Sequence, residues 1–391
     1  MNTEKWDEII SNSNHLTKPA RVSQLFNSTD IEKFSLLIAE VMVEFARQGK
    51  PANGLKCFLD GKFDISTNQR FVADPPDKSQ GIEDWAKEFF HEVPFGMIMN
   101  FLENYSNELV QEVGIKVRPL LNRVGFPFSG LSLLFFMGDY GYTPFGAHKG
   151  TPGEDGFLCH LGPADKVFYT WETDVYDNLT GGVQGYQDLD KILAYATEHI
   201  LKPGDVMFIP SDVYHVANTK DFSISLILDF RRATHEMVKK TLVKNLTFTQ
   251  KDLETYIEPL VDFNSLDPAI SFFSNIEEAY KKHLCILRSN GGFLTPSVSQ
   301  KIVLNWECSF SIKEPFRIIE YAFESKKVYF ARGHEISVSH DSIFSQIIDQ
   351  LNAGRTVGRK TIESFGVSIY RSDLIALFSQ LLQADILEIK T

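Results

Sequence analysis

The sequence predicts an α+β protein whose centre is a small barrel of short antiparallel strands, with helices before and after it. Residues 31–45 carry apolar side chains at helical spacing. After Gly125, short β-branched and aromatic runs alternate with Gly, Pro and Asp, which is typical of strands joined by turns. Helical spacing returns at Thr234. These features indicate a mainly β core between two helical regions.

Composition limits the class of protein. At 391 residues the chain exceeds one typical hydrophobic core, so a large domain and at least one smaller one are expected. Hydrophobic residues make up 43% and aromatic residues 13%, which is enough for packed cores and argues against disorder. The net charge of −12 argues against sequence-independent binding to nucleic acid, which relies on Lys and Arg. We therefore expect no nucleic-acid partner.

Cysteine usage and the N-terminus bear on the compartment. The four cysteines are scattered and form no CxxC pair, which is typical of free thiols in a reducing environment. The first residues lack the basic start and apolar stretch of a signal peptide. No run of 18 apolar residues occurs, so no membrane partner is expected. These observations predict a cytoplasmic protein.

Residues 1–125 are expected to be the helical N-terminal part of the main domain. Helices are predicted over residues 31–45, after a cap at Ser28, Thr29 or Asp30, and over residues 82–90 and 102–121. Residues 126–232 are expected to form the β core, with one amphipathic helix over 189–201. The predicted strands are residues 131–137, 156–161, 166–172, 205–210 and 223–230.

The last third of the chain divides into two predicted regions. Residues 233–319 are expected to form a helical linker or dimerisation region. In residues 320–391, strand-like runs precede helices predicted at 343–351 and 373–382, the latter after a Ser372 cap, and a final strand ILEI. This order suggests a winged-helix module. Because nothing basic marks its second helix for a DNA groove, we expect a protein contact or a homodimer there.

Two histidines lie in segments of matching character. His148 follows an aromatic strand end, and His215 follows the run PGDVMFIPSDVY, 67 residues further on, where a barrel would place it at its mouth. A mononuclear non-haem iron centre needs two neutral imidazoles and usually one carboxylate on one face. Side chains two residues apart on a strand face the same side, so residue 150 is the natural third position beside His148. The pair therefore predicts metal ligation.

These segments resemble the jumonji-C (JmjC) branch of the 2-oxoglutarate oxygenases. The matching text is TPFGAH, FLCHLGPADKVFYTW, PGDVMFIPSDVYH and SISLILDF, which covers about residues 125–232, and the C-terminus matches loosely. The chain is similar in particular to the bacterial cupin-like members that modify peptides and ribosomes. These members also tend to carry a C-terminal winged-helix module. The resemblance implies a double-stranded β-helix (jelly-roll) core.

The resemblance also implies cofactors and roles. Iron(II) would be held by His148 and His215, and O2 and 2-oxoglutarate would oxidise an aliphatic C–H of a peptide, protein or amino-acid-type substrate. Lys166 matches the lysine that holds the distal carboxylate of 2-oxoglutarate in such enzymes, and an ammonium in a partly dry barrel favours an anion. Tyr142, Thr143 and Tyr169 are candidates for additional hydroxyl hydrogen bonds to this co-substrate.

The metal motif departs from the family at one position. Where the family has Asp or Glu, this sequence has Gly150. Loss of the carboxylate would leave an open coordination position for chloride. In this respect the motif resembles that of the radical halogenases of the same superfamily, which carry Gly or Ala there and transfer chlorine instead of hydroxyl.

Other interpretations of Gly150 stay open. The stretch GTPGEDG has the composition of a turn, in which case Glu154 or Asp155 would supply the carboxylate of a hydroxylase with unusual spacing. A third interpretation is a barrel that no longer binds iron. It would then serve, with the C-terminal module, as a non-catalytic protein- or peptide-binding platform.

Overall fold

The computed structural model describes residues 3–49, 54–77, 80–91, 93–244, 246, 271–323, 326–338 and 342–390. Two compact units divide the chain. The first comprises Met1–Pro127 and Leu131–Arg232, and the second comprises Phe128–Gly130 and Ala233–Thr391. Within the described residues, no helix is both long enough and apolar enough to cross a membrane.

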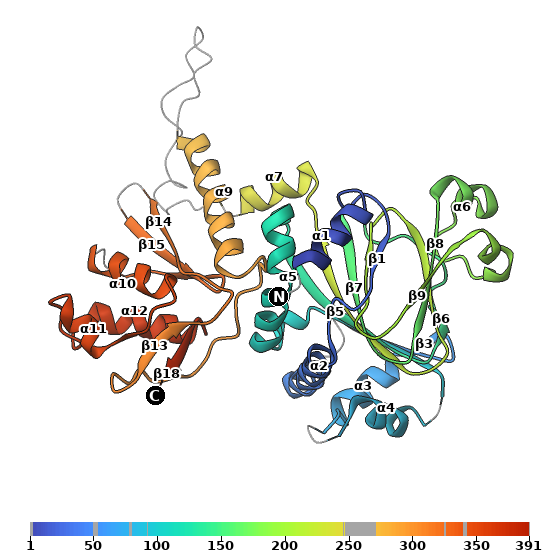
Figure 1. Cartoon of the computed structure of the whole chain (residues 1–391), viewed down its shortest axis with the longest axis horizontal. Helices are drawn as coiled ribbons and strands as arrows, with labels where there is room; N and C mark the ends of the chain where they lie inside the picture. The colour runs from blue at the N-terminus through green and yellow to red at the C-terminus, as the bar shows by residue number, and fades with distance from the viewer. Residues whose placement is uncertain are drawn as a thin grey trace, which may run out of the picture. The chain divides into compact units, whose positions relative to one another are not determined.

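The first unit is built around two antiparallel sheets (Figure 1). The large sheet has the strand order β1-β10-β7-β12-β5-β4-β2-β3, and the small sheet has the order β6-β11-β8-β9. The confirmed fold class is therefore α+β with a mainly antiparallel β core. The strands are β1 (Ala20–Val22), β2 (Leu55–Leu59), β3 (Lys62–Phe63), β4 (Phe95–Asn100), β5 (Leu131–Gly138), β6 (Gly141–Tyr142), β7 (Glu154–Pro163), β8 (Lys166–Trp171), β9 (Thr197–Leu201), β10 (Val206–Ile209), β11 (Tyr214–Thr219) and β12 (Ser223–Arg231).

Strand β12 lies between β5 and β7, and its alternating side chains serve the two faces of the large sheet. Leu226 and Leu228 point to one face, where they line a small apolar pocket together with side chains of α1, α2 and α5. Ile227 and Asp229 point to the other face, toward the cavity described below. The alternation thus separates the hydrophobic core from the candidate site.

Helices cover the outer face of the large sheet (Figure 1). The N-cap of α2 is Asn27, whose side chain accepts a hydrogen bond from the Asp30 backbone N–H at 2.9 Å, one residue before the predicted cap. Trp6 of α1 packs edge-on against Phe157 at 5.9 Å between ring centroids. The helices of this unit are α1 (Thr3–Asn12), α2 (Ser28–Gln48), α3 (Ile65–Ala73), α4 (Ile82–Phe90), α5 (Asn107–Val124) and α6 (Thr173–Thr180), with 3-10 turns η1 (Leu102–Asn104), η2 (Leu189–Lys191) and η3 (Leu193–Tyr195).

Two expectations for this unit differ from the structure. The helix predicted over residues 189–201 is wrong, because this segment forms two 3-10 turns followed by β9, which pairs with β8. The apolar side chains at helical spacing in this segment lie in the turns and in β9. Pairing of β9 with a neighbouring strand overrides the local preference of the segment for a helix. The N-terminal region is helical as expected, but it also supplies β1–β4 to the large sheet.

The second unit contains helices and two three-stranded sheets. The predicted helices at 343–351 and 373–382 correspond to α10 and α12, and the N-cap of α12 is Arg371, one residue before Ser372. The helical prediction for 233–319 includes residues 247–270, which lie outside the described part of the chain. The elements are α7 (His235–Lys244), α9 (Ser271–Ser289), β13 (Ser309–Ile312), β14 (Ile319–Phe323), β15 (Lys326–Ala331), β16 (His334–Ile336), α10 (Ser342–Asn352), β17 (Val357–Gly358), α11 (Arg359–Ser364), α12 (Ser372–Gln383) and β18 (Leu387–Lys390).

Candidate active site

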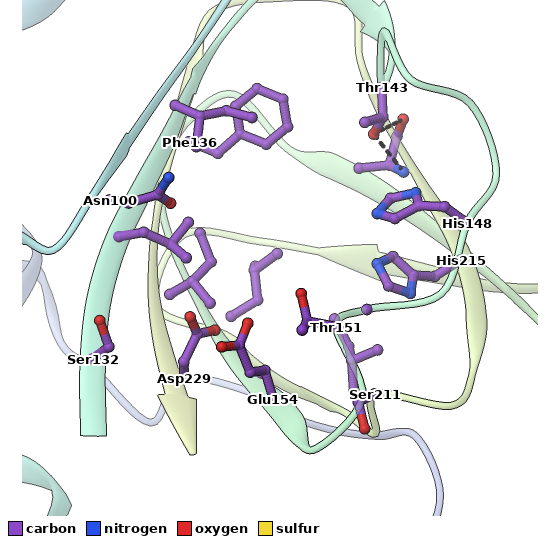
Figure 2. A pocket seen from close by; sticks show the side chains of 18 of the residues that line it. Asn100, Ser132, Phe136, Thr143, His148, Thr151, Glu154, Ser211, His215 and Asp229 are labelled. Carbon is purple, nitrogen blue, oxygen red and sulfur yellow. Dashed lines mark hydrogen bonds between the residues drawn. The ribbon is translucent and has the colours of Figure 1, made fainter. Parts of the chain in front are cut away.

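His148 and His215 lie side by side at one wall of the barrel (Figure 2). Their backbones form an antiparallel bridge, in which the N–H of each donates to the carbonyl of the other at 3.0 and 2.8 Å. The ring centroids are 4.4 Å apart, with an angle of 57° between the planes. Two residues that are 67 positions apart in the sequence are therefore brought together with their rings facing the same space.

Hydrogen bonds set the orientation of each imidazole. Nδ1 of His148 lies 2.9 Å from the Gly146 carbonyl oxygen, and Nδ1 of His215 lies 2.9 Å from the Val213 carbonyl oxygen. When each Nδ1–H donates to its carbonyl, each Nε2 keeps a free lone pair, the arrangement typical of metal-binding histidines.

Electrostatics favour the neutral form of both rings. Burial lowers the pKa of His148. Burial and the neighbouring His148 lower the pKa of His215 to about 3. Neutral imidazoles are the form that binds a divalent metal. The donor set present therefore fits a metal ion with two nitrogen ligands.

The structure brings no third metal-binding side chain of the described residues into a group with these two histidines. Among the described residues, no group of three His, Cys, Asp or Glu side chains is placed to hold a metal ion. The Glu154 carboxylate instead accepts a hydrogen bond from Arg231 at 3.2 Å. The Asp155 carboxylate, only 2% exposed, binds Arg232 at 2.7 Å. Both alternative carboxylates are therefore engaged by arginines, although Glu154 lines the same cavity as the histidines.

Gly150 lines the same cavity as the histidines. Its φ is not in the left-handed region that favours glycine, whereas that of Gly153 is 85°. A Cβ added at Gly150 would lie 3.4 Å from the Ser211 Cα, which is ordinary van der Waals contact. The backbone turn consequently does not require glycine at position 150.

The histidines face a cavity of about 400 Å3 between the two sheets. Apolar walls come from both sheets and polar side chains gather at one end (Figure 2). A cavity of this size is in the range of small-molecule sites. Its lining includes Asn100, Ser132, Leu134, Phe136, Thr143, Phe145, His148, Gly150, Thr151, Glu154, Leu158, Lys166, Phe168, Ser211, His215, Ile227, Asp229 and Arg231.

Lys166 contributes a buried ammonium to this cavity. The residue is only 1% exposed, and none of the carboxylates of the described residues forms an ion pair with it. Its Nζ lies 3.4 Å from the Tyr140 hydroxyl and 5.6 Å from the centroid of the Phe136 ring. Burial lowers the pKa of Lys166 to about 7. An anion bound here would supply the missing counter-charge.

Of the three residues whose hydroxyls were predicted to contact 2-oxoglutarate, the structure places one at the cavity and two away from its described lining. Thr143 lines the cavity, and its Oγ1 accepts a hydrogen bond from the Ala217 backbone N–H at 3.1 Å. Tyr142 and Tyr169 pack together, 6.4 Å apart, against a cluster that includes Trp171. Their rings are therefore absent from the described lining of the cavity, contrary to expectation. Position 169 is three residues from Lys166, so strand alternation turns it to the other face.

Sequence reasoning missed Tyr140, whose buried hydroxyl is next to Lys166. It also gave no role to Asp229, which lies near Glu154 at the polar end of the cavity (Figure 2), or to Arg231, which lines the same cavity and pairs with Glu154. Burial and the nearby Glu154 raise the pKa of Asp229 to about 7. Strand parity would have found Asp229, because it shares a face with Ile227 and Ser225 of β12.

Comparison with known proteins bears on the fold. No family model and no curated protein sequence matches the chain. One solved structure, described as the ribosomal oxygenase YcfD from Escherichia coli in complex with cobalt and 2-oxoglutarate, matches with a TM-score of 0.51 at 12% identity, over 99% of this chain and 98% of that one. This chain has the YcfD fold. A second structure of E. coli YcfD gives 0.50 at 11% identity, covering 98% of both chains.

Proposed function

We propose that this protein is an Fe(II)- and 2-oxoglutarate-dependent oxygenase that oxidises an aliphatic C–H of a peptide, protein or amino-acid-type substrate. One observation carries the proposal: a single cavity is lined by two imidazoles, each oriented by an Nδ1 contact to a carbonyl, and by the buried Lys166 ammonium, with which no carboxylate of the described residues forms an ion pair. A metal and a dicarboxylate are the pair of ligands that complement these groups. The likeness to a ribosomal oxygenase favours a protein substrate.

The iron and the 2-oxoglutarate would be held by different residues of the cavity. His148 and His215 would hold the iron, and Lys166, with the Tyr140 and Thr143 hydroxyls nearby, would hold the distal carboxylate of 2-oxoglutarate. Iron with O2 and this co-substrate would supply the oxidising power that no side chain has. The two Nδ1 hydrogen bonds keep each imidazole in the tautomer and orientation that the metal requires.

Aromatic side chains in the walls of the cavity position the two imidazole rings. Phe145 contacts His148 edge-on at 4.5 Å, and Phe168 stacks on His215 at 5.3 Å between centroids. These contacts restrict rotation of the imidazoles. At the polar end, Asp229 and Arg231 face the space left for the substrate, where they would bind its polar groups.

We propose further that the outcome is chlorine transfer, with hydroxylation in its place when a carboxylate is restored at position 150. The support is that Glu154 and Asp155 are engaged by arginines, and that Gly150 lines the same cavity as the histidines but brings no carboxylate to it. The open coordination position would accept chloride. A hydroxylase with a displaced carboxylate would need Glu154 to leave Arg231.

Turnover of the co-substrate tests the proposal without a known substrate. Protein incubated with Fe(II), O2, chloride and 2-oxoglutarate is expected to release succinate slowly, and the Lys166→Met variant, which should not bind 2-oxoglutarate, is expected to release almost none. Absence of succinate formation in the wild type contradicts an oxygenase and favours a binding barrel, whereas formation that is unchanged in the variant contradicts the role given to Lys166. Mass spectrometry of peptides treated with the enzyme, with and without chloride, then separates chlorination from hydroxylation.

A further inference from the structure

A groove separate from the barrel cavity lies between α2, the start of α4 and the adjoining ends of β7 and β12. Its volume is about 470 Å3. Buried apolar side chains, including Leu161 and Ile224, form its floor. Leu36 of α2 lies at its edge and is 56% exposed, which is unusual for a large apolar side chain beside a cavity. The groove thus offers apolar surface to a partner.

Charge on the groove has one sign. Its lining includes four carboxylates, Glu32, Glu40, Glu83 and Asp84, and no Lys or Arg among the described residues. Glu83 is paired with Lys87 at 2.9 Å. The other three form no ion pair with any residue in the described part of the chain. An apolar segment that carries positive charge complements this surface.

The spacing on α2 makes the complementarity specific. Glu32, Leu36 and Glu40 are four residues apart and therefore lie in one row on the helix. With a rise of 1.5 Å per residue, the two carboxylates are about 12 Å apart along the helix axis, with Leu36 midway. In an extended peptide, side chains two residues apart share a face, and four residues span about 13 Å. The row therefore matches a basic–x–apolar–x–basic pattern.

We propose that this groove binds an extended peptide segment in which one apolar side chain lies between two basic residues, each two positions away. The apolar side chain would enter the groove beside Leu36. The basic side chains would lie on Glu32 and Glu40, with Asp84 opposite. This binding does not require iron or 2-oxoglutarate. It can therefore be tested independently of the proposed oxidation.

Fluorescence anisotropy with short labelled peptides tests the proposal on the full-length protein. The probe is fluorescein-Gly-Lys-Ser-Leu-Ser-Arg-Gly, and two control peptides replace its Leu by Ser or both basic residues by Glu. We expect the probe to bind at least about tenfold more tightly than either control and to weaken as salt rises. Equal binding of the serine peptide would indicate general charge attraction and overturn the groove proposal.

Variants locate the binding on the protein. The triple variant Glu32→Gln, Glu40→Gln, Asp84→Asn is expected to weaken probe binding about tenfold, or about 1.4 kcal/mol. The Leu36→Ser variant is expected to weaken it as well, and both should keep the wild-type circular dichroism because the changed side chains lie at the surface. The matched control is Glu4→Gln, Asp174→Asn, Asp190→Asn, which removes equal charge elsewhere. Equal loss in this control, or no loss in the first variant, refutes the site.

Discussion

Replacement of Lys166 by Met should stabilise the apo protein while abolishing its binding of 2-oxoglutarate. Met has a similar length and no charge, so it fills the same space beside Phe136 and Tyr140. The wild-type ammonium lacks a carboxylate partner among the described residues, and an uncompensated buried charge is destabilising. A buried charge that lowers stability is expected where the residue has a function.

The magnitude follows from the pKa of the ammonium. Its fall from 10.5 to about 7, at about 1.4 kcal/mol for each pH unit, corresponds to about 5 kcal/mol of lost native-state stability. Water in the adjoining cavity solvates part of the charge, so we expect the variant to gain about 2–4 kcal/mol at pH 7. Between pH 7 and 10.5 the unfolded wild type binds more protons than the native state. The stability of the wild type therefore rises with pH in this interval, and the rise should be absent from the variant.

Urea unfolding followed by tryptophan fluorescence at pH 7 and pH 10 measures this effect, and calorimetry with a redox-stable metal measures co-substrate binding. The control is Lys116→Met, which removes an ammonium paired with Asp30 and should lower stability slightly. The Lys166→Arg variant, which keeps the charge, should retain part of the binding. A Lys166→Met variant that is no more stable than wild type and still binds 2-oxoglutarate would refute the reasoning.

Three further predictions concern the metal, the polar end and the backbone. His215→Ala should abolish tight metal binding, measured by calorimetry, whereas the surface variant His91→Ala should bind as wild type does. Because the pKa of Asp229 is raised to about 7, wild-type stability should fall as pH rises from about 4 to 7, and Asp229→Asn should flatten that fall in denaturation at several pH values. Gly138→Ala should lower the melting temperature, because its φ is 146° and a Cβ there would lie 2.0 Å from the Phe95 carbonyl oxygen; an unchanged melting temperature would contradict this close packing.

Local pattern predicted much of the fold because strands and helices leave different periodicities. Runs such as residues 223–230 and 82–90 became β12 and α4 with nearly the expected ends. The prediction for residues 189–201 was wrong because their apolar residues have a spacing compatible with a helix, whereas the end of this segment forms a strand that pairs with β8. Pairing of this kind depends on residues distant in the sequence, and periodicity does not encode it.

The same limit applies to the site. The sequence singled out the two histidines because each stands in a recognisable segment, and Lys166 because it matches a position in the family that the sequence resembles. The structure places all three on one cavity, and their roles stay predictions. Tyr169 was misplaced although strand parity with Lys166 predicts the opposite face. The engagement of Glu154 by Arg231 was not predictable, because these residues are 77 positions apart and meet only through the pairing of β7 with β12.

Anaerobic titration with Fe(II), followed by 2-oxoglutarate, tests most directly whether one metal joins the two imidazoles and the co-substrate. The wild-type protein should bind one Fe(II) per chain and then develop the weak visible charge-transfer band of a chelated 2-oxo acid. The His215→Ala variant should show neither. A wild-type protein without the band, or a variant that keeps it, would contradict the proposed iron site.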